Sequence, residues 1–154
     1  MWQRIQTVFL LIAIISLIIS VFYPIWSTTE TSGKIHQLFP LHYTQIENGV
    51  RNTIYFPYTV TAIFIVAAAT LAIIEIRKYR NRILQMKLGA LNSLFIAGAI
   101  ASAVYFSSSL VKTFQGGQYG LGLWLPAVAV ICNLLANQFI RRDERLVRDS
   151  GRLR

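Results

Sequence analysis

The sequence predicts an all-α membrane protein with four transmembrane helices in two hairpins, both chain ends in the cytoplasm, and a small extracytoplasmic loop that could form a β-hairpin. Three observations lead to this fold class. Hydrophobic residues make up 55% of the 154 residues and charged residues only 14%. The mean hydropathy of +0.51 is too high for a soluble domain of this size. Finally, Lys and Arg are concentrated between and after long uncharged stretches.

Four uncharged stretches are long enough to cross a bilayer, which takes about 20 apolar residues in a helix. A charged side chain at the bilayer centre is expensive, so charges mark the ends of the spans. The uncharged stretches cover residues 5–29, 52–74, 88–111 and 113–140. Without their polar ends, they predict helices at about 4–23, 55–76, 88–110 and 121–140. We expect them to form one domain over residues 1–154.

The first apolar segment follows Arg4 and could also belong to a secretory signal peptide. No small-residue cleavage pattern follows it, and Tyr23 and Trp26 are typical of a helix end at the membrane interface. We therefore predict an uncleaved helix. The polar loop after it, residues 24–54, holds two β-prone runs around Asn48-Gly49, a dipeptide that favours a type I′ turn. These runs, residues 41–46 and 50–55, predict a short hairpin.

The distribution of cations predicts the orientation. The N-terminal segment, the basic loop 77–87 and the tail 141–154 together hold twelve of the 15 Lys and Arg residues. Cytoplasmic loops carry the excess of cations, so these segments are expected in the cytoplasm of a bacterium, beneath its inner membrane. We expect seven of the cations to contact anionic lipid headgroups or a docking protein: Arg77, Lys78, Arg80, Arg82, Lys87, Arg141 and Arg142. Nucleic acid is not an expected partner of this +9 chain, because no reader motif accompanies the charge.

Small and polar residues inside the predicted helices suggest how the helices pack. Two neighbouring rows on the third helix would let another helix, from this chain, from a second copy in a homo-oligomer or from a protein partner, come close. They comprise Gly89, Ser93, Ala97, Gly98, Ala101 and Ser102. Asn92, Asn133 and Asn137 must find partners in an apolar setting. We interpret them as interhelical hydrogen-bonding residues; the alternative is that they line a pore or a quinone-sized pocket.

No pattern predicts a catalytic centre, a cofactor site or a metal site. Glu75 adjoins the second span and could be a proton-relay group, but we interpret it as an interfacial residue that pairs with Lys78 or contacts Tyr79. His36 and His42 stand six residues apart across Pro40, a spacing that matches no metal-ligand signature. The single cysteine, Cys132, excludes an intrachain disulfide.

Three segments carry a resemblance to a known family. They are MWQRIQTVFLL at the N-terminus, NRILQMKL after the second span, and ANQFIRRDERLVRDSGRLR at the C-terminus. Together they resemble a bacterial family of roughly four-helix membrane proteins, described as a domain of unknown function. The resemblance covers essentially the whole chain. It implies a four-span inner-membrane protein with these segments on one face, and it implies no activity.

These observations favour a non-enzymatic scaffold or accessory subunit of a larger membrane complex, because no midplane charge is expected and the third helix is suited to contact. A small transporter or a lipid- or quinone-binding protein is the alternative, with a cavity at Asn92, Asn133 or Asn137. A membrane enzyme would need Glu75 beside a histidine, which the predicted topology places on opposite sides of the membrane.

Overall fold

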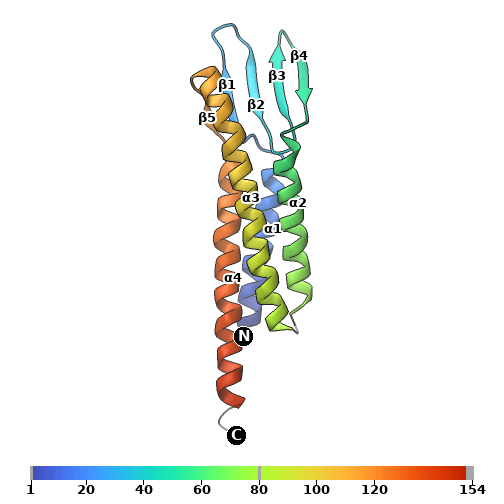
Figure 1. Cartoon of the computed structure of the whole chain (residues 1–154), viewed down its shortest axis with the longest axis vertical. Helices are drawn as coiled ribbons and strands as arrows, with labels where there is room; N and C mark the ends of the chain where they lie inside the picture. Colours follow the sequence, from blue (N-terminus) through green and yellow to red (C-terminus); the bar gives the residue numbers. More distant parts are fainter. Residues whose placement is uncertain (1, 80, 152–154) are drawn as a thin grey trace.

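The chain forms a bundle of helices that carries a β-sheet at one end (Figure 1). This computed structural model describes residues 2–79 and 81–151, with side chains at 5–79 and 81–147. Within these residues the helices are α1 (Trp2–Ser20), α2 (Thr59–Arg77), α3 (Arg82–Phe114) and α4 (Leu121–Gly151). The strands are β1 (Trp26–Thr29), β2 (Ile35–Leu38), β3 (Tyr43–Glu47), β4 (Val50–Ile54) and β5 (Gln118–Tyr119).

The four helices pack side by side around an apolar core. α1 lies against α4 and α2, and α3 lies against α2 and α4, so each helix has two neighbours in the bundle. Small side chains such as Ala13, Ala68, Ala99 and Ala129 meet in the middle and bring the helices close together. Cys132 packs into the same core as a free thiol. The uncharged stretches thus form the bundle because their apolar faces cover one another.

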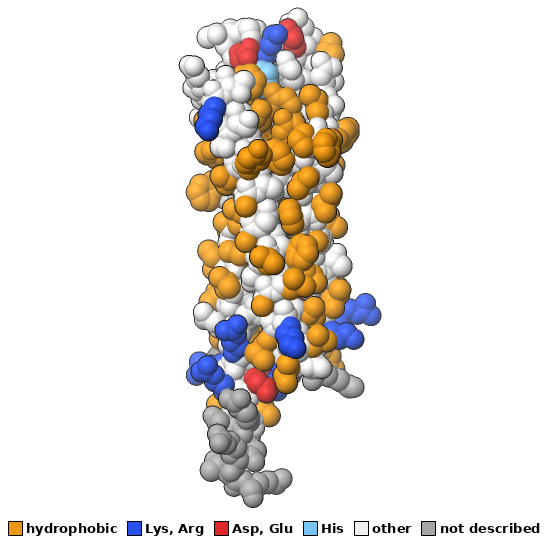
Figure 2. Space-filling model, in the orientation of Figure 1, with side chains coloured by type: hydrophobic (Ala, Val, Ile, Leu, Met, Phe, Trp, Pro, Cys, Tyr) orange, Lys and Arg blue, Asp and Glu red, His pale blue; other side chains and the backbone are white. Residues whose placement is uncertain are grey.

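Three helices in the described part of the chain are long and apolar enough to cross a membrane: Thr59–Arg77, Arg82–Phe114 and Leu121–Val147. The apolar segment Ile5–Ser20 of α1 is shorter. On the face shown in Figure 2, apolar side chains cover the middle of the bundle and Lys and Arg gather toward the end away from the sheet. This arrangement supports association with a membrane.

The prediction of an all-α protein is wrong, because residues 26–54 form four strands of a five-stranded antiparallel sheet. The strand order is β4-β3-β2-β1-β5. The hairpin at Asn48-Gly49 is present as β3 and β4, and both turn residues have the positive φ of a type I′ turn, 49° and 80°. The hairpin of β1 and β2 was not predicted. Neither was β5, which the glycine-rich connection between α3 and α4 adds beside β1.

The sheet is stable at this position because α3 continues beyond the length that a membrane requires. Its 33 residues correspond to about 50 Å, against a hydrocarbon core of about 30 Å. The final turns of α3 place Leu110 and Phe114 against the sheet face that carries Trp26 and Leu38. Phe114 also packs against His36, with ring centroids 4.2 Å apart. One sheet face is therefore buried on α3, and the other face is open.

Candidate functional site

Two asparagines predicted from the sequence join α3 to α4 inside the bundle. Asn92 Nδ2 donates a hydrogen bond to Asn133 Oδ1 at 3.0 Å. Asn133 Nδ2 donates to the carbonyl of Gly89 at 2.9 Å and to Ser93 Oγ at 2.8 Å. Asn137 packs directly on Gly89, where an added Cβ would overlap its amide. These contacts hold the two helices in one register.

Asn133→Ala is expected to lower the free energy of unfolding by about 2 kcal/mol, because three interhelical hydrogen bonds disappear and the Asn92 amide stays buried. The measurement is unfolding of the purified protein in mixed detergent micelles. Gln138→Ala, at an exposed position on the same helix, is the control and should change the stability little. Equal stability of the two variants would contradict a structural role for Asn133.

The small residues of α3 divide into buried and exposed positions. Gly89 and Ser93 face α4 through the asparagine contacts described above. Gly98 packs against Phe64 of α2, and Ser102 shares a 3.0 Å hydrogen bond with Thr61. Ala97 and Ala101 are exposed on the outside of the bundle. The chain's own helices therefore fill most of this surface, and two alanines are left facing outward.

Glu75 is buried inside the bundle and does not pair with Lys78, contrary to our interpretation of the sequence. Its side chain is 0% exposed, and neither carboxyl oxygen has a hydrogen-bond partner among the described residues. Glu75 lies in the same buried row of α2 as Ile65, Ala68 and Ala72, so the helix directs its carboxyl group into the core. This spacing, visible in the sequence, was the signal that could have identified the burial.

The other buried polar residues near this end of the bundle are amides. Gln6 on α1 and Gln85 on α3 are 3% and 1% exposed. Gln85 Oε1 has no partner among the described residues, and the same holds for Asn92 Oδ1 and Asn137 Oδ1. The unpartnered atoms of this region, including those of Glu75, are thus all oxygen acceptors.

The predicted inner cations differ in their surroundings. Arg82 forms an ion pair with Asp143 at 3.1 Å and also donates to the Asp143 carbonyl at 3.0 Å, which ties the start of α3 to α4. Exposed positions are held by Arg77, Lys78, Lys87, Arg141 and Arg142. Arg80 lies outside the described residues. Arg82 therefore contributes to the packing of the bundle end as well as to its charge.

His36 and His42 lie on the sheet, far from the end of α2 that carries Glu75 (Figure 1). His36 Nδ1 is 2.6 Å from the Tyr43 hydroxyl, and His36 Nε2 is 3.3 Å from Glu30 Oε1. No group of three or more metal-ligating side chains occurs in the part of the chain that was described. The buried His36 ring thus lies between the half-exposed Glu30 carboxylate and the Tyr43 hydroxyl.

The burial of Tyr43 predicts that the protein loses stability at high pH. Burial, and then the nearby Tyr58 and Glu30, raises the pKa of Tyr43 to about 12, against about 10 in an unfolded chain. Between these values the unfolded state loses a proton that the native state keeps, so stability that is complete below pH 10 decreases as the pH rises. Tyr43→Phe should therefore lose stability less steeply than the native protein from pH 10 to about 12. The free energy of unfolding of both proteins is measured from pH 10 to about 12. An equal decrease in both would contradict the raised pKa of Tyr43 as the cause.

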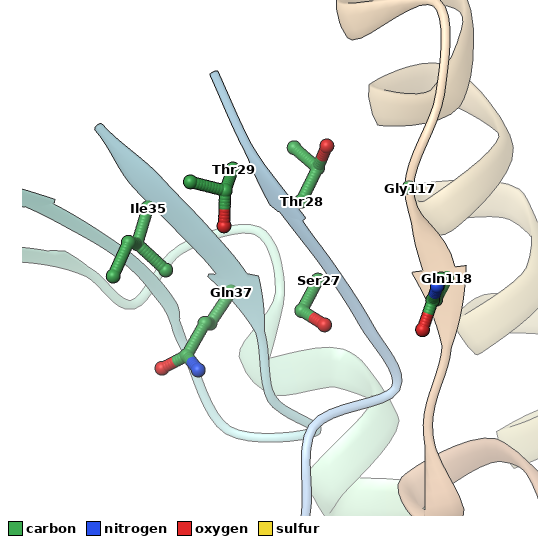
Figure 3. Close-up of a pocket in the computed structure, with 7 residues that line it drawn as sticks. All are labelled: Ser27, Thr28, Thr29, Ile35, Gln37, Gly117 and Gln118. Atoms are coloured by element: carbon green, nitrogen blue, oxygen red, sulfur yellow. The ribbon is translucent and has the colours of Figure 1, made fainter. Parts of the chain in front are cut away.

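The open face of the sheet carries a broad groove of about 540 Å³ beside β5 (Figure 3). Hydroxyl and amide groups predominate in its lining, which consists of Ser27, Thr28, Thr29, Ile35, Gln37, Gly117 and Gln118. The strand register places Ser27 beside Gln37 and Thr29 beside Ile35 on this open face. Sequence reasoning missed these residues, because neither β1 (WSTT) nor β2 (IHQL) shows the alternation of polar and apolar side chains that marks a strand.

The groove also exposes an unpaired sheet edge. Among the described residues, β5 pairs with Trp26 and Ser27, and no strand pairs with the end of β1 on that side. The Glu30 amide bonds to the Lys34 carbonyl on the β2 side, so alternation directs the backbone groups of Thr29 toward the β5 side, where the Gly120 amide bonds to the Ile25 carbonyl. The N–H and C=O groups of Thr29 therefore point into the groove. On the opposite edge, alternation from the Glu47–Val50 pair directs the backbone groups of Thr53 outward.

Comparison with known proteins identifies a family for this chain. A search of curated proteins found no match. The family model of a domain of unknown function, DUF4293, matches residues 2–153. The four helices and the sheet described above all lie within the matched residues. The chain therefore belongs to the DUF4293 family.

Proposed function

We propose that this protein is a non-enzymatic accessory subunit, or scaffold, of a larger complex in the bacterial inner membrane. It spans the membrane four times, with both ends in the cytoplasm and the sheet outside. The concentration of twelve of the 15 Lys and Arg residues in the segments at the end opposite the sheet supports this orientation. The apolar surfaces of the helices support the spans.

The observation that carries this proposal is the unpaired edge at Thr29 beside a polar groove. An exposed edge offers backbone donors and acceptors to an extended segment of another chain, and polar side chains alongside it provide specificity. One face of the sheet is fixed on α3, so the edge is presented on a rigid support. The partner is thus an extracytoplasmic segment of another membrane protein, bound as an added strand.

The buried polar residues give less support to a transporter. Asn92 and Asn133 use their amides on each other, on Gly89 and on Ser93. Asn137 is buried against Gly89. These contacts account for the three asparagines as packing residues.

Two matched proline variants test the proposal. Thr29→Pro removes an N–H that points into the groove, and Thr53→Pro makes the same change at the opposite edge. Neither N–H has a partner within the sheet, so both variants should fold. The proteins are purified after gentle solubilisation, and co-purifying proteins are identified by mass spectrometry.

The proposal expects a specific membrane partner that Thr29→Pro loses and Thr53→Pro retains. Loss with Thr53→Pro alone would move the docking site to β4. A partner retained by both variants would exclude strand addition as the mode of binding. A monomer without any partner would argue against an accessory role altogether.

A further inference from the structure

A second pocket lies on the opposite side of the open sheet face, where the sheet meets the end of α1. Its volume is about 380 Å³, within the range of small-molecule sites. Half of its lining is apolar and comes from the segment after α1 and the β2–β3 turn, with Val21, Phe22, Phe39 and Leu41. The polar half is formed by Gln37, His42, Thr44 and Arg51. Because Val21 and Phe22 directly follow α1, the pocket lies at the level of the outer membrane interface.

The polar half contains donors without partners. Thr44 is 1% exposed, and its hydroxyl has no hydrogen-bond partner among the described residues. The buried Nδ1 of His42 is equally unpartnered. Gln37 and Thr44 are cross-strand neighbours, and the register places Arg51 on the same face. Hydroxyl, imidazole, amide and guanidinium groups can therefore all donate hydrogen bonds to one polar group of a ligand.

The charge of the pocket favours an anion. Among the described residues that line it, Arg51 alone is charged and none is acidic. The nearby acids are engaged elsewhere: Glu47 pairs with Lys34 at 2.9 Å, and Glu30 lies 3.3 Å from His36. Burial, and then the positive charge of Arg51, lowers the pKa of His42, so the imidazole is neutral at physiological pH. A negatively charged group would compensate Arg51 and satisfy the donors around it.

We infer that this pocket binds an amphiphile with an anionic headgroup, and that the ligand is a phospholipid of the outer leaflet. The phosphate oxygens bind to Arg51 and to the Thr44 hydroxyl, with Gln37 and His42 as further donors. The acyl chain passes along Phe22 and Leu41 into the membrane. The site rests on the proposed orientation of the chain but not on strand docking: it shares Gln37 with the groove beside β5, and its ligand contacts side chains and not the edge of β1.

Binding is measured with the full-length protein in nanodiscs of phosphatidylcholine, to which fluorescent phosphatidylglycerol is added. Arg51→Gln should weaken phosphatidylglycerol binding by about tenfold or more, because it removes a charge-assisted contact. Thr44→Val should weaken binding by about threefold or more. This variant keeps the shape of a buried side chain whose hydroxyl has no partner, so its folding should be preserved.

The control variant is Lys112→Gln, which removes one exposed positive charge from the outer end of α3, away from the pocket. It should bind phosphatidylglycerol as the native protein does. If Lys112→Gln weakens binding as much as Arg51→Gln, the attraction is a general effect of charge and the site is excluded. Native-level binding by Thr44→Val would likewise overturn the assignment of the buried hydroxyl as a ligand contact.

A separate measurement distinguishes a lipid from a soluble anion. The thermal stability of the protein in neutral detergent is followed with added inorganic phosphate or with added phosphatidylglycerol. The inference expects stabilisation by the lipid at low mole fraction and little effect of millimolar phosphate. Stabilisation by inorganic phosphate alone, abolished by Arg51→Gln, would show that the pocket takes a soluble oxyanion and would overturn the lipid assignment.

Discussion

Gly117→Ala is expected to reduce the free energy of unfolding by about 3–5 kcal/mol and to detach β5 from the sheet. Gly117 has a φ of +111°, which side chains other than glycine rarely adopt. An added Cβ would also overlap the indole ring of Trp26, which is 0% exposed in the core beneath the sheet. Strain and overlap therefore act together. The measurement is unfolding in mixed micelles.

The neighbouring glycine provides the control for this substitution. Around Gly116 the nearest atom to an added Cβ is 3.9 Å away, an ordinary contact. Gly116→Ala should therefore leave stability within about 0.5 kcal/mol of the native value. If both variants unfold alike, the close approach between Gly117 and Trp26 is not important for stability.

Glu75→Leu is expected to raise the free energy of unfolding by about 3 kcal/mol, the largest stabilisation that a single substitution should produce here. The carboxyl group is 0% exposed, and neither oxygen has a hydrogen-bond partner among the described residues. Leucine fills a similar volume without a polar group to desolvate. The same unfolding measurement detects the gain as a shift of the transition to higher denaturant concentration.

Two further variants sharpen this prediction. Glu75→Gln replaces the carboxyl group with a neutral amide of the same shape, so it should recover part of the stabilisation. Glu144→Gln removes a carboxyl from the polar end of α4 and should change stability by no more than about 0.5 kcal/mol. If Glu75→Leu destabilises the protein, the carboxyl group makes a favourable interaction in the core that its surroundings do not show. If Glu75→Leu is more stable than the native protein, packing and stability do not explain why an acid occupies this position.

The helices could be derived from the sequence because each one is specified by local properties. A charge that interrupts an apolar run ends a span regardless of the rest of the fold, and this rule placed four helices in the regions of α1 to α4. It did not place their ends, because α3 begins at Arg82, inside the predicted basic loop 77–87, and α4 continues to Gly151, through most of the predicted tail. The predicted third helix ended at residue 110, but α3 continues to Phe114, because its last turns pack on the sheet and not on lipid. The turn at Asn48-Gly49 was equally local, since both residues favour positive φ.

The candidate sites depend on contacts that a local pattern does not contain. β5 joins β1 although some 90 residues separate them in the sequence, and this pairing creates the groove at Thr29. The second pocket, where the sheet meets the end of α1, likewise forms only because Phe22, after α1, and Arg51, on β4, lie close together. Short strands of four or five residues have too few side chains to show a clear period. Their pairing is decided by the surface that α3 offers to them.

The sequence by itself determined the four apolar segments, the distribution of cations and the β3–β4 turn, because charge, hydropathy and turn propensity act over neighbouring residues. Only the tertiary structure decided which side chains surround Glu75, how Asn92 meets Asn133, and which sheet face remains open. Those outcomes depend on the rotation of each helix about its axis and on the register of distant strands. Both are fixed by side-chain packing across the whole molecule.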